Sequence, residues 1–425
     1  PRHWSHLLYN LNYLFLLQMK KLFRHFLSPK HGGDDVDLVT LINHLIHNAG
    51  FSQYTKVLKV HWVASVSTFC FFFTCITQVI ALFMAREDPE KLFECFSVLS
   101  FCGMGVLKLL SLRISHKKWH FLLSQIATLE DEQLNGGSVS CVEYHSDSEG
   151  SDHFSEYITS YTYKFKSTST ILRRIYSFTL VIFILSPFVE YLLCILRGLD
   201  YLEYPHILPG WAPLDELTLF GYIVTIICEL MAAIYCVYVH IAFDLTSVGV
   251  MIFVCGQFAL LRDYSSRVAG KGRKCRPSKR RDDRAHFRII QCHHTNLLLI
   301  NSITELGKLL QSIIGAYFFV ATLTLCSVAV RLKTEDMSVM QLVSLLQYMC
   351  ATLTQLFLFC RYGDAVLNES SVGMGQGPFA AASWCLSPSI RRELTMLGAS
   401  MMRPRHLRAG PLNYLDLPSF IQVSN

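Results

Sequence analysis

The hydrophobic positions of this chain gather in long blocks instead of alternating with polar positions. Three blocks contain no Asp, Glu, Lys or Arg, namely 61–85, 309–330 and 337–360. Three others carry one charged residue each, namely Lys108 in 95–112, Glu190 in 175–196 and Glu229 in 217–243. A helix needs about 20 residues to cross the hydrocarbon core of a bilayer. The pattern therefore predicts an all-α integral membrane protein with six complete transmembrane helices.

The distribution of basic residues predicts on which side of the membrane the ends of these helices lie. Lys and Arg near helix ends favour the cytosolic side, and they concentrate before the first block, after the second, between the fourth and fifth and after the sixth. The other three loops are acidic or balanced. This places the N-terminus in the cytosol, which is inverted relative to G-protein-coupled receptors. The segment after Gly410 then has to return toward the outside as a seventh span, which the 425-residue sequence leaves truncated.

Composition agrees with this class and adds no sign of catalysis. Hydrophobic residues make up 52% of the chain and charged residues 16%, against about 25% charged in soluble domains. We find no HExxH or GxSxG motif, and Cys292, His293 and His294 lack a second ligand cluster for a metal. We expect no enzyme, cofactor or metal. The basic stretch 271–284 is better suited to anionic membrane lipid than to nucleic acid.

The sequence divides into the following expected segments. We expect a possible non-native extension at 1–18, a cytosolic segment at 19–56, six helices with their loops at 57–362, a cytosolic helical region at 363–410 and the start of span seven at 411–425. Within this division, 116–170 and 262–291 are expected to be cytosolic loops. The apolar periodicity of 245–261 predicts that span four continues as a long helix beyond the membrane.

Aromatic residues in the outer halves of the spans, with one buried carboxylate, are the candidates for a ligand pocket. Aromatic side chains that converge between helices would form an apolar cavity for a small molecule, whereas single ones usually face lipid or the interface. Glu229 lies in mid-span, where a carboxylate needs a partner, a pocket or a water path. The candidate residues are Phe188, Tyr191, Phe220, Tyr222, Glu229 and Tyr317.

The C-terminal third carries a family resemblance. The segments QLFLFCRYGDAVLNESSVGMGQGPFAAASW (355–384) and RRELTMLGASMMRPRHLRAGPLNYLDLPSF (391–420) resemble the insect odorant receptors. The resemblance rests on Gly363 and Asp364 at the end of span six, on the Arg-Arg helix, and on the turn at Ala409 and Gly410 that leads to Ser419 and Phe420.

The resemblance implies a seven-span, ligand-gated, non-selective cation channel subunit. It implies assembly with a coreceptor as a heterotetramer, a small volatile ligand among the outer halves of the helices, and a location in the plasma membrane of olfactory sensory neurons. The chain lacks the long insertion of the coreceptor and so resembles an odorant-tuning subunit. Subunit contacts would involve Trp384, Arg391 and Arg392. A membrane transporter and a non-conducting chemoreceptor of inverted topology remain the alternatives.

Overall fold

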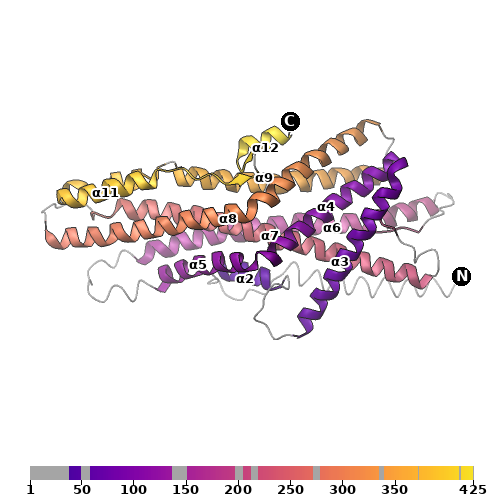
Figure 1. The fold of residues 1–425 in the computed structure, drawn as a ribbon, viewed down its shortest axis with the longest axis horizontal. Coiled ribbons are helices and arrows are strands. Elements are labelled where there is room, and N and C mark those ends of the chain that lie inside the picture. The colour runs from indigo at the N-terminus through magenta and orange to yellow at the C-terminus, as the bar shows by residue number, and fades with distance from the viewer. Residues whose placement is uncertain are drawn as a thin grey trace.

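The computed structural model describes residues 38–48, 58–135, 151–196, 204–211, 219–270, 278–334, 339–371, 373–410 and 413–424. These residues form an elongated bundle of helices (Figure 1). The helices in chain order are α2 (Leu38–Asn48), α3 (Leu58–Met84), the 3-10 turn η1 (Ala85–Glu87), α4 (Pro89–Ile114), α5 (His116–Asn135), α6 (Ser151–Leu196), α7 (Leu219–Ser266), α8 (Lys279–Thr334), α9 (Val339–Ser371), α10 (Gln376–Ala380), the 3-10 turn η2 (Ser383–Cys385), α11 (Pro388–Met401) and α12 (Leu417–Ser424).

Six of these helices are long and apolar enough to cross a membrane, which confirms the predicted all-α membrane class. They are α3, α4, α6, α7, α8 and α9. Helix α8 has 56 residues and is therefore about 84 Å long at 1.5 Å per residue. That length is more than twice the hydrocarbon core of about 30 Å, so α8 extends well beyond the membrane.

Two of the expected loops are largely helical. Helix α5 occupies His116–Asn135, and α6 already begins at Ser151, within the stretch 116–170. Helix α7 runs on to Ser266 and α8 starts at Lys279, so the second loop is also much shorter than 262–291. The predicted continuation of span four through 245–261 is present as part of α7. The predicted extension at 1–18 lies outside the described residues.

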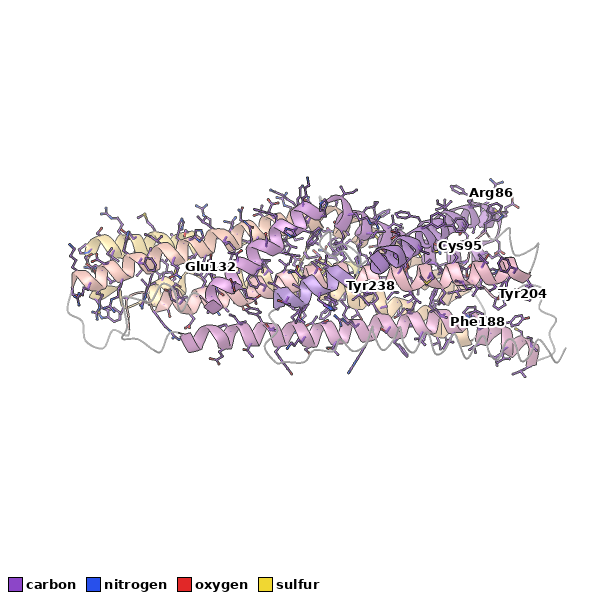
Figure 2. The ribbon with its side chains drawn as sticks, turned by 90° about the horizontal axis from the view of Figure 1, so that it is seen from below. Arg86, Cys95, Glu132, Phe188, Tyr204 and Tyr238 are labelled. Carbon is purple, nitrogen blue, oxygen red and sulfur yellow. The ribbon has the colours of Figure 1, made fainter. Side chains whose placement is uncertain are left out.

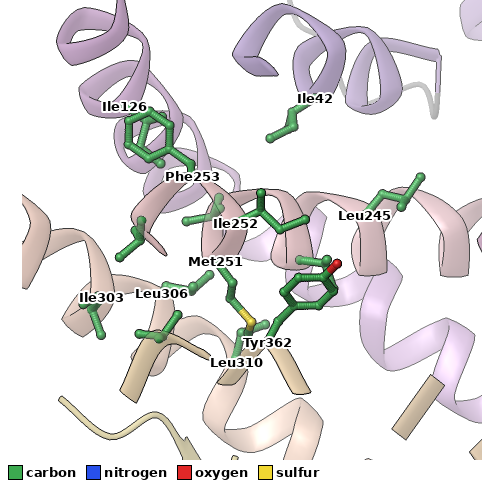
Figure 3. Close-up of a cluster of buried hydrophobic side chains, with 14 of the residues drawn as sticks. Ile42, Ile126, Leu245, Met251, Ile252, Phe253, Ile303, Leu306, Leu310 and Tyr362 are labelled. Carbon is green, nitrogen blue, oxygen red and sulfur yellow. The ribbon is translucent and has the colours of Figure 1, made fainter. Parts of the chain in front are cut away.

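Helix α7 is the central element of the bundle. It contacts α2, α3, α4, α6, α8, α9 and α10, and every residue of its stretch 239–254 is buried. Figure 3 shows Leu245, Met251, Ile252 and Phe253 of α7 among side chains from neighbouring helices. The half of α7 nearer its start is different, because Phe220 and Ile227 expose much of their surface. We expect these exposed side chains to face lipid.

A short hairpin lies between α11 and α12 in the chain. Strand β1 (Arg408–Ala409) pairs antiparallel with β2 (Asn413–Tyr414), and Gly410 between them has a φ of 75°. Gly410 lies against Gly315 of α8. A Cβ atom added to Gly315 would lie only 2.7 Å from the Gly410 Cα. The Gly410 N–H donates to Gln311 O at 2.9 Å. This close approach fixes where α12 starts beside α9.

Candidate ligand-binding site

A cavity of about 420 Å³ lies near the end of the bundle where α3 turns into α4. Its walls come from α4, α6, α7 and α9, with Arg331 from α8, and residues 204–209 form its roof. Figure 2 shows Tyr204 and Phe188 at the same end as Arg86 and Cys95, away from Glu132. A volume of this size falls within the usual range for small-molecule pockets, about 300–1,000 Å³.

The lining of this cavity is apolar in its body and carries charge at a few positions. Apolar lining residues are Val98, Phe101, Leu180, Phe183, Ile207, Leu208, Ala233, Val237 and Leu345. Hydroxyl groups are supplied by Ser97, Tyr176, Thr179, Ser186, Tyr204, Ser344 and Tyr348. Glu94, Glu190 and Arg331 bring charge from three different helices. Such a lining suits a mostly apolar molecule that makes a small number of polar contacts.

Glu229 holds the roof of the cavity in place. Its side chain, 5% exposed, accepts hydrogen bonds from the backbone N–H groups of Ile207 at 2.9 Å and Leu208 at 3.3 Å. The Nδ1 of His206 lies 3.1 Å from the other carboxylate oxygen. The mid-span carboxylate thus has the partners that its burial requires. It binds a loop that dips between the helices instead of a second helix.

Further contacts fix the two ends of the roof. The Tyr222 hydroxyl donates to Pro205 O at 2.8 Å, and its ring lies 5.7 Å from the ring of His206. At the other end, the Trp211 N–H donates to Thr77 O of α3 at 3.2 Å. Pro205 and Pro209 restrict the backbone between these contacts. Hydrogen bonds to α7 at one end and to α3 at the other therefore hold the roof over the cavity.

Below the cavity, a buried polar network joins four helices. Lys108 of α4 is fully buried, and its Nζ lies 2.6 Å from Asp244 Oδ1 and 3.0 Å from His240 Nδ1, both on α7. Asp244 Oδ2 accepts hydrogen bonds from the Tyr176 hydroxyl of α6 at 2.6 Å and from Gln355 Nε2 of α9 at 2.8 Å. A buried charge pair is tolerated only when its remaining positions are hydrogen-bonded, and this one meets that condition.

The network reaches the cavity through two side chains. Tyr176 lines the cavity and also donates to Asp244. Phe101 lines it as well and stacks on His240 at 4.3 Å between ring centroids. The His240 Nε2 lies 3.2 Å from Phe101 O. The Tyr176 ring is thus connected to Asp244 directly, and the Phe101 ring to Lys108 through His240.

The six predicted pocket residues take different positions around this site. Tyr222 and Glu229 anchor the roof, Tyr317 is buried beside the polar network, and Phe220 is 75% exposed on the outside of α7. Phe188 and Tyr191 are half-buried and each follows a lining residue of α6, Pro187 and Glu190 respectively. Among the described residues, none of the six belongs to the lining of the large cavity. Their role in ligand binding stays a prediction.

Sequence reasoning missed the residues that line the cavity and the ion pair beneath it. Lys108 carried a signal, because it is the single charge in an otherwise apolar block. Asp244 directly follows another apolar block, but nothing in the sequence connects two positions that are 136 residues apart. Which residues of α6 and α9 line the cavity depends on how each helix is rotated about its axis. The sequence does not predict this rotation, because the apolar residues of these segments follow no clear periodicity.

The three residues predicted for subunit contact lie at the opposite end of the bundle. Trp384 is 67% exposed in η2, and Arg391 and Arg392 are exposed on α11. Helix α11 packs on the start of α8, where His286 Nδ1 lies 2.7 Å from a Glu393 oxygen. The Ser387 N–H donates to Asp282 at 3.1 Å. These contacts leave Trp384 on the surface.

Comparison with known proteins gives both a family and a fold. The family model of the 7tm odorant receptors matches residues 88–425. The solved insect olfactory receptor OR5 from Machilis hrabei superposes with a TM-score of 0.70 at 13% identity, covering 91% of this chain and 94% of that one. The same receptor in complex with eugenol gives a TM-score of 0.69 at 15% identity, with coverage of 91% and 94%. A search of the curated proteins finds no match.

Proposed function

The chain belongs to the 7tm odorant receptor family, and we propose that it is an odorant-tuning subunit of a ligand-gated, non-selective cation channel. The family consists of ligand-gated receptors, so the chain is not an enzyme. The six membrane-length helices make it a multi-pass membrane protein. We place it in the plasma membrane of olfactory sensory neurons, together with a coreceptor subunit in a heterotetramer.

The cavity of about 420 Å³ is the observation that supports ligand binding most directly. A protein of the same fold, OR5 from Machilis hrabei, has been solved with eugenol bound. Burying about 150–250 Å² of an apolar ligand at about 25 cal/mol/Å² contributes roughly 4–6 kcal/mol before entropic costs. That range supports binding at micromolar to millimolar concentrations. We therefore assign the cavity to a small volatile, mostly apolar odorant.

We further propose that the roof end of the bundle faces outward. Helix α11, which carries the exposed Arg391 and Arg392, and the start of α8, which carries Lys279, Arg280 and Arg281, lie at the other end (Figure 1). Basic residues favour the cytosolic side. In this orientation an odorant reaches the cavity from outside, and Trp384 is available to a neighbouring subunit in the cytosol. Exposed tryptophan is a frequent anchor of protein interfaces.

Filling the cavity tests this assignment. Ala233 lines the cavity and is buried on α7, so Ala233→Phe places a ring in the space that the odorant would occupy. We expect the half-maximal odorant concentration to rise at least about tenfold, which corresponds to about 1.4 kcal/mol. The measurement is the cation current in cells that express the receptor with its coreceptor, normalised for surface expression.

Ile227→Ala provides the control, because Ile227 lies on the same helix but on its exposed side. We expect no change in sensitivity for this variant. Leu345→Ala enlarges the cavity from α9 and should change the rank order of odorants instead of abolishing the response. Unchanged dose-response curves for both Ala233→Phe and Leu345→Ala, at normal surface expression, would contradict the assignment of the cavity.

A further inference from the structure

A second, much smaller cavity adjoins the first. It has a volume of about 30 Å³ and lies between α4, α6, α7, α8 and α9, next to the buried network of Lys108 and Asp244. Four residues, Phe101, Tyr176, Thr179 and Tyr348, line both cavities and form their shared wall. A cavity of this size has room for one group as large as a water molecule or a hydroxyl.

The polar groups around the small cavity mostly present oxygen atoms that can accept a hydrogen bond. Three tyrosines use their O–H groups elsewhere. Tyr176 donates to Asp244 at 2.6 Å, Tyr317 to Thr352 O at 2.9 Å, and Tyr348 to Ser97 O at 3.1 Å. A hydroxyl that donates once can still accept. The cavity therefore favours a group that brings a proton to donate.

Thr324 of α8 adds a hydroxyl without a well-formed hydrogen bond. Its side chain lines the small cavity and is 1% exposed, and among the described residues its Oγ1 makes no hydrogen bond of standard geometry, although the Tyr348 hydroxyl lies near it. Thr322, two residues earlier, shows the usual alternative, because its hydroxyl donates to Phe318 O at 2.9 Å. Buried hydroxyls without a partner are costly, so Thr324 is the group in this wall that gains most from an incoming ligand.

We propose that the small cavity is a polar subsite for the hydroxyl of an alcohol or phenol whose apolar part fills the large cavity. The hydroxyl accepts from Thr324 and donates to a tyrosine oxygen of the shared wall. An ether or ketone of equal size can only accept, so it satisfies Thr324 but offers no proton to the tyrosines. The subsite thus selects hydroxylated odorants among ligands of equal bulk. This inference rests on the proposed function of the large cavity.

The experiment compares three probes with the same number of heavy atoms, namely heptanol, methyl hexyl ether and octane. The unfolding temperature of the purified receptor in lipid nanodiscs is followed as each probe is titrated, because binding to the native state raises it in proportion to occupancy. We expect heptanol to bind about three- to tenfold more tightly than the ether, the usual contribution of one hydrogen bond.

Two variants of Thr324 test whether the ligand oxygen lies in the subsite. Thr324→Val keeps the shape and removes the hydroxyl from which the alcohol and the ether both accept a hydrogen bond, so both should bind about three- to tenfold more weakly while the binding of octane stays unchanged. Thr324→Ser keeps the hydroxyl and should retain the wild-type affinities, which also separates the effect from a folding defect. Unchanged affinities of the alcohol and the ether in Thr324→Val would overturn the proposal.

The probes also separate this inference from the proposed function. Equal binding of heptanol, ether and octane to the wild type contradicts the polar subsite and leaves the large cavity as an apolar ligand site. Failure of all three to bind contradicts both the subsite and the cavity as an odorant site. Loss of all binding in Ala233→Phe, with a retained alcohol preference in Thr324→Ser, supports both.

Discussion

Two buried carboxylates on α7 have opposite structural roles. Asp244 is 1% exposed and accepts hydrogen bonds from Lys108, Tyr176 and Gln355, which come from three other helices. Glu229 is 5% exposed, and its contacts are the backbone of Ile207 and Leu208 and the ring of His206, all on the loop that covers the cavity. The first carboxylate joins helices, and the second positions a roof.

The difference follows from what surrounds each carboxylate. Near Asp244, α7 is buried on all sides, so the charge has to be met by side chains of the neighbouring helices. Near Glu229 one side of α7 is exposed and the other faces the cavity, and the hydrogen-bond partners of its carboxylate within the described residues lie on the loop. Removing the partner of Asp244 should therefore weaken the whole fold, whereas weakening the contacts of Glu229 should mainly affect the closure of the ligand site.

The largest effect is expected for Lys108→Met. The substitution keeps most of the side-chain volume and leaves Asp244 as a buried carboxylate without its cation. Breaking a buried ion pair in this way typically costs about 3–5 kcal/mol. We expect a large decrease in the unfolding temperature of the purified protein and little of it at the cell surface, as measured by thermal unfolding and surface labelling.

The double variant Lys108→Met/Asp244→Asn is the matched control. It removes both charges and keeps an amide that can still bond to Tyr176 and Gln355. A buried ion pair can often be replaced by neutral groups at little cost, so this variant should recover more than half of the lost stability. A double variant as unstable as Lys108→Met would show that the ion pair is not the source of the effect.

The sequence predicted the membrane class, the six spans and the long α7, because each depends on the length of an apolar block. It did not predict the cavity, since Ala233, Val237 and Leu345 lie in segments where apolar residues occupy every face. Glu229 could be flagged as a buried charge in need of a partner. That the partner is a dipping loop at 206–208 depends on tertiary structure alone, and so does the pairing of Lys108 with Asp244.

A smaller effect is expected for Glu229→Gln. Glutamine replaces the charged acceptor by a neutral amide, whose single oxygen can accept from the N–H groups of Ile207 and Leu208 while its NH₂ group faces His206 Nδ1. Hydrogen bonds to a charged acceptor contribute about 1.5–3 kcal/mol, so the roof should open more often. We expect faster protease cleavage within 204–211 and a half-maximal odorant concentration raised about tenfold or more. Unchanged values of both would contradict the anchoring role of Glu229.

The smallest effect is expected for Tyr222→Phe. This change removes a single hydroxyl, the donor to Pro205 O at 2.8 Å, and keeps the ring beside His206 and Tyr204. One neutral hydrogen bond contributes about 0.5–1.5 kcal/mol, so sensitivity should fall by about twofold to tenfold with no loss of surface expression. Because Tyr222 does not line the large cavity, the decrease should be similar for odorants of every chemical class. A decrease confined to alcohols, with ethers and hydrocarbons unaffected, would instead show that Tyr222 contacts the ligand itself.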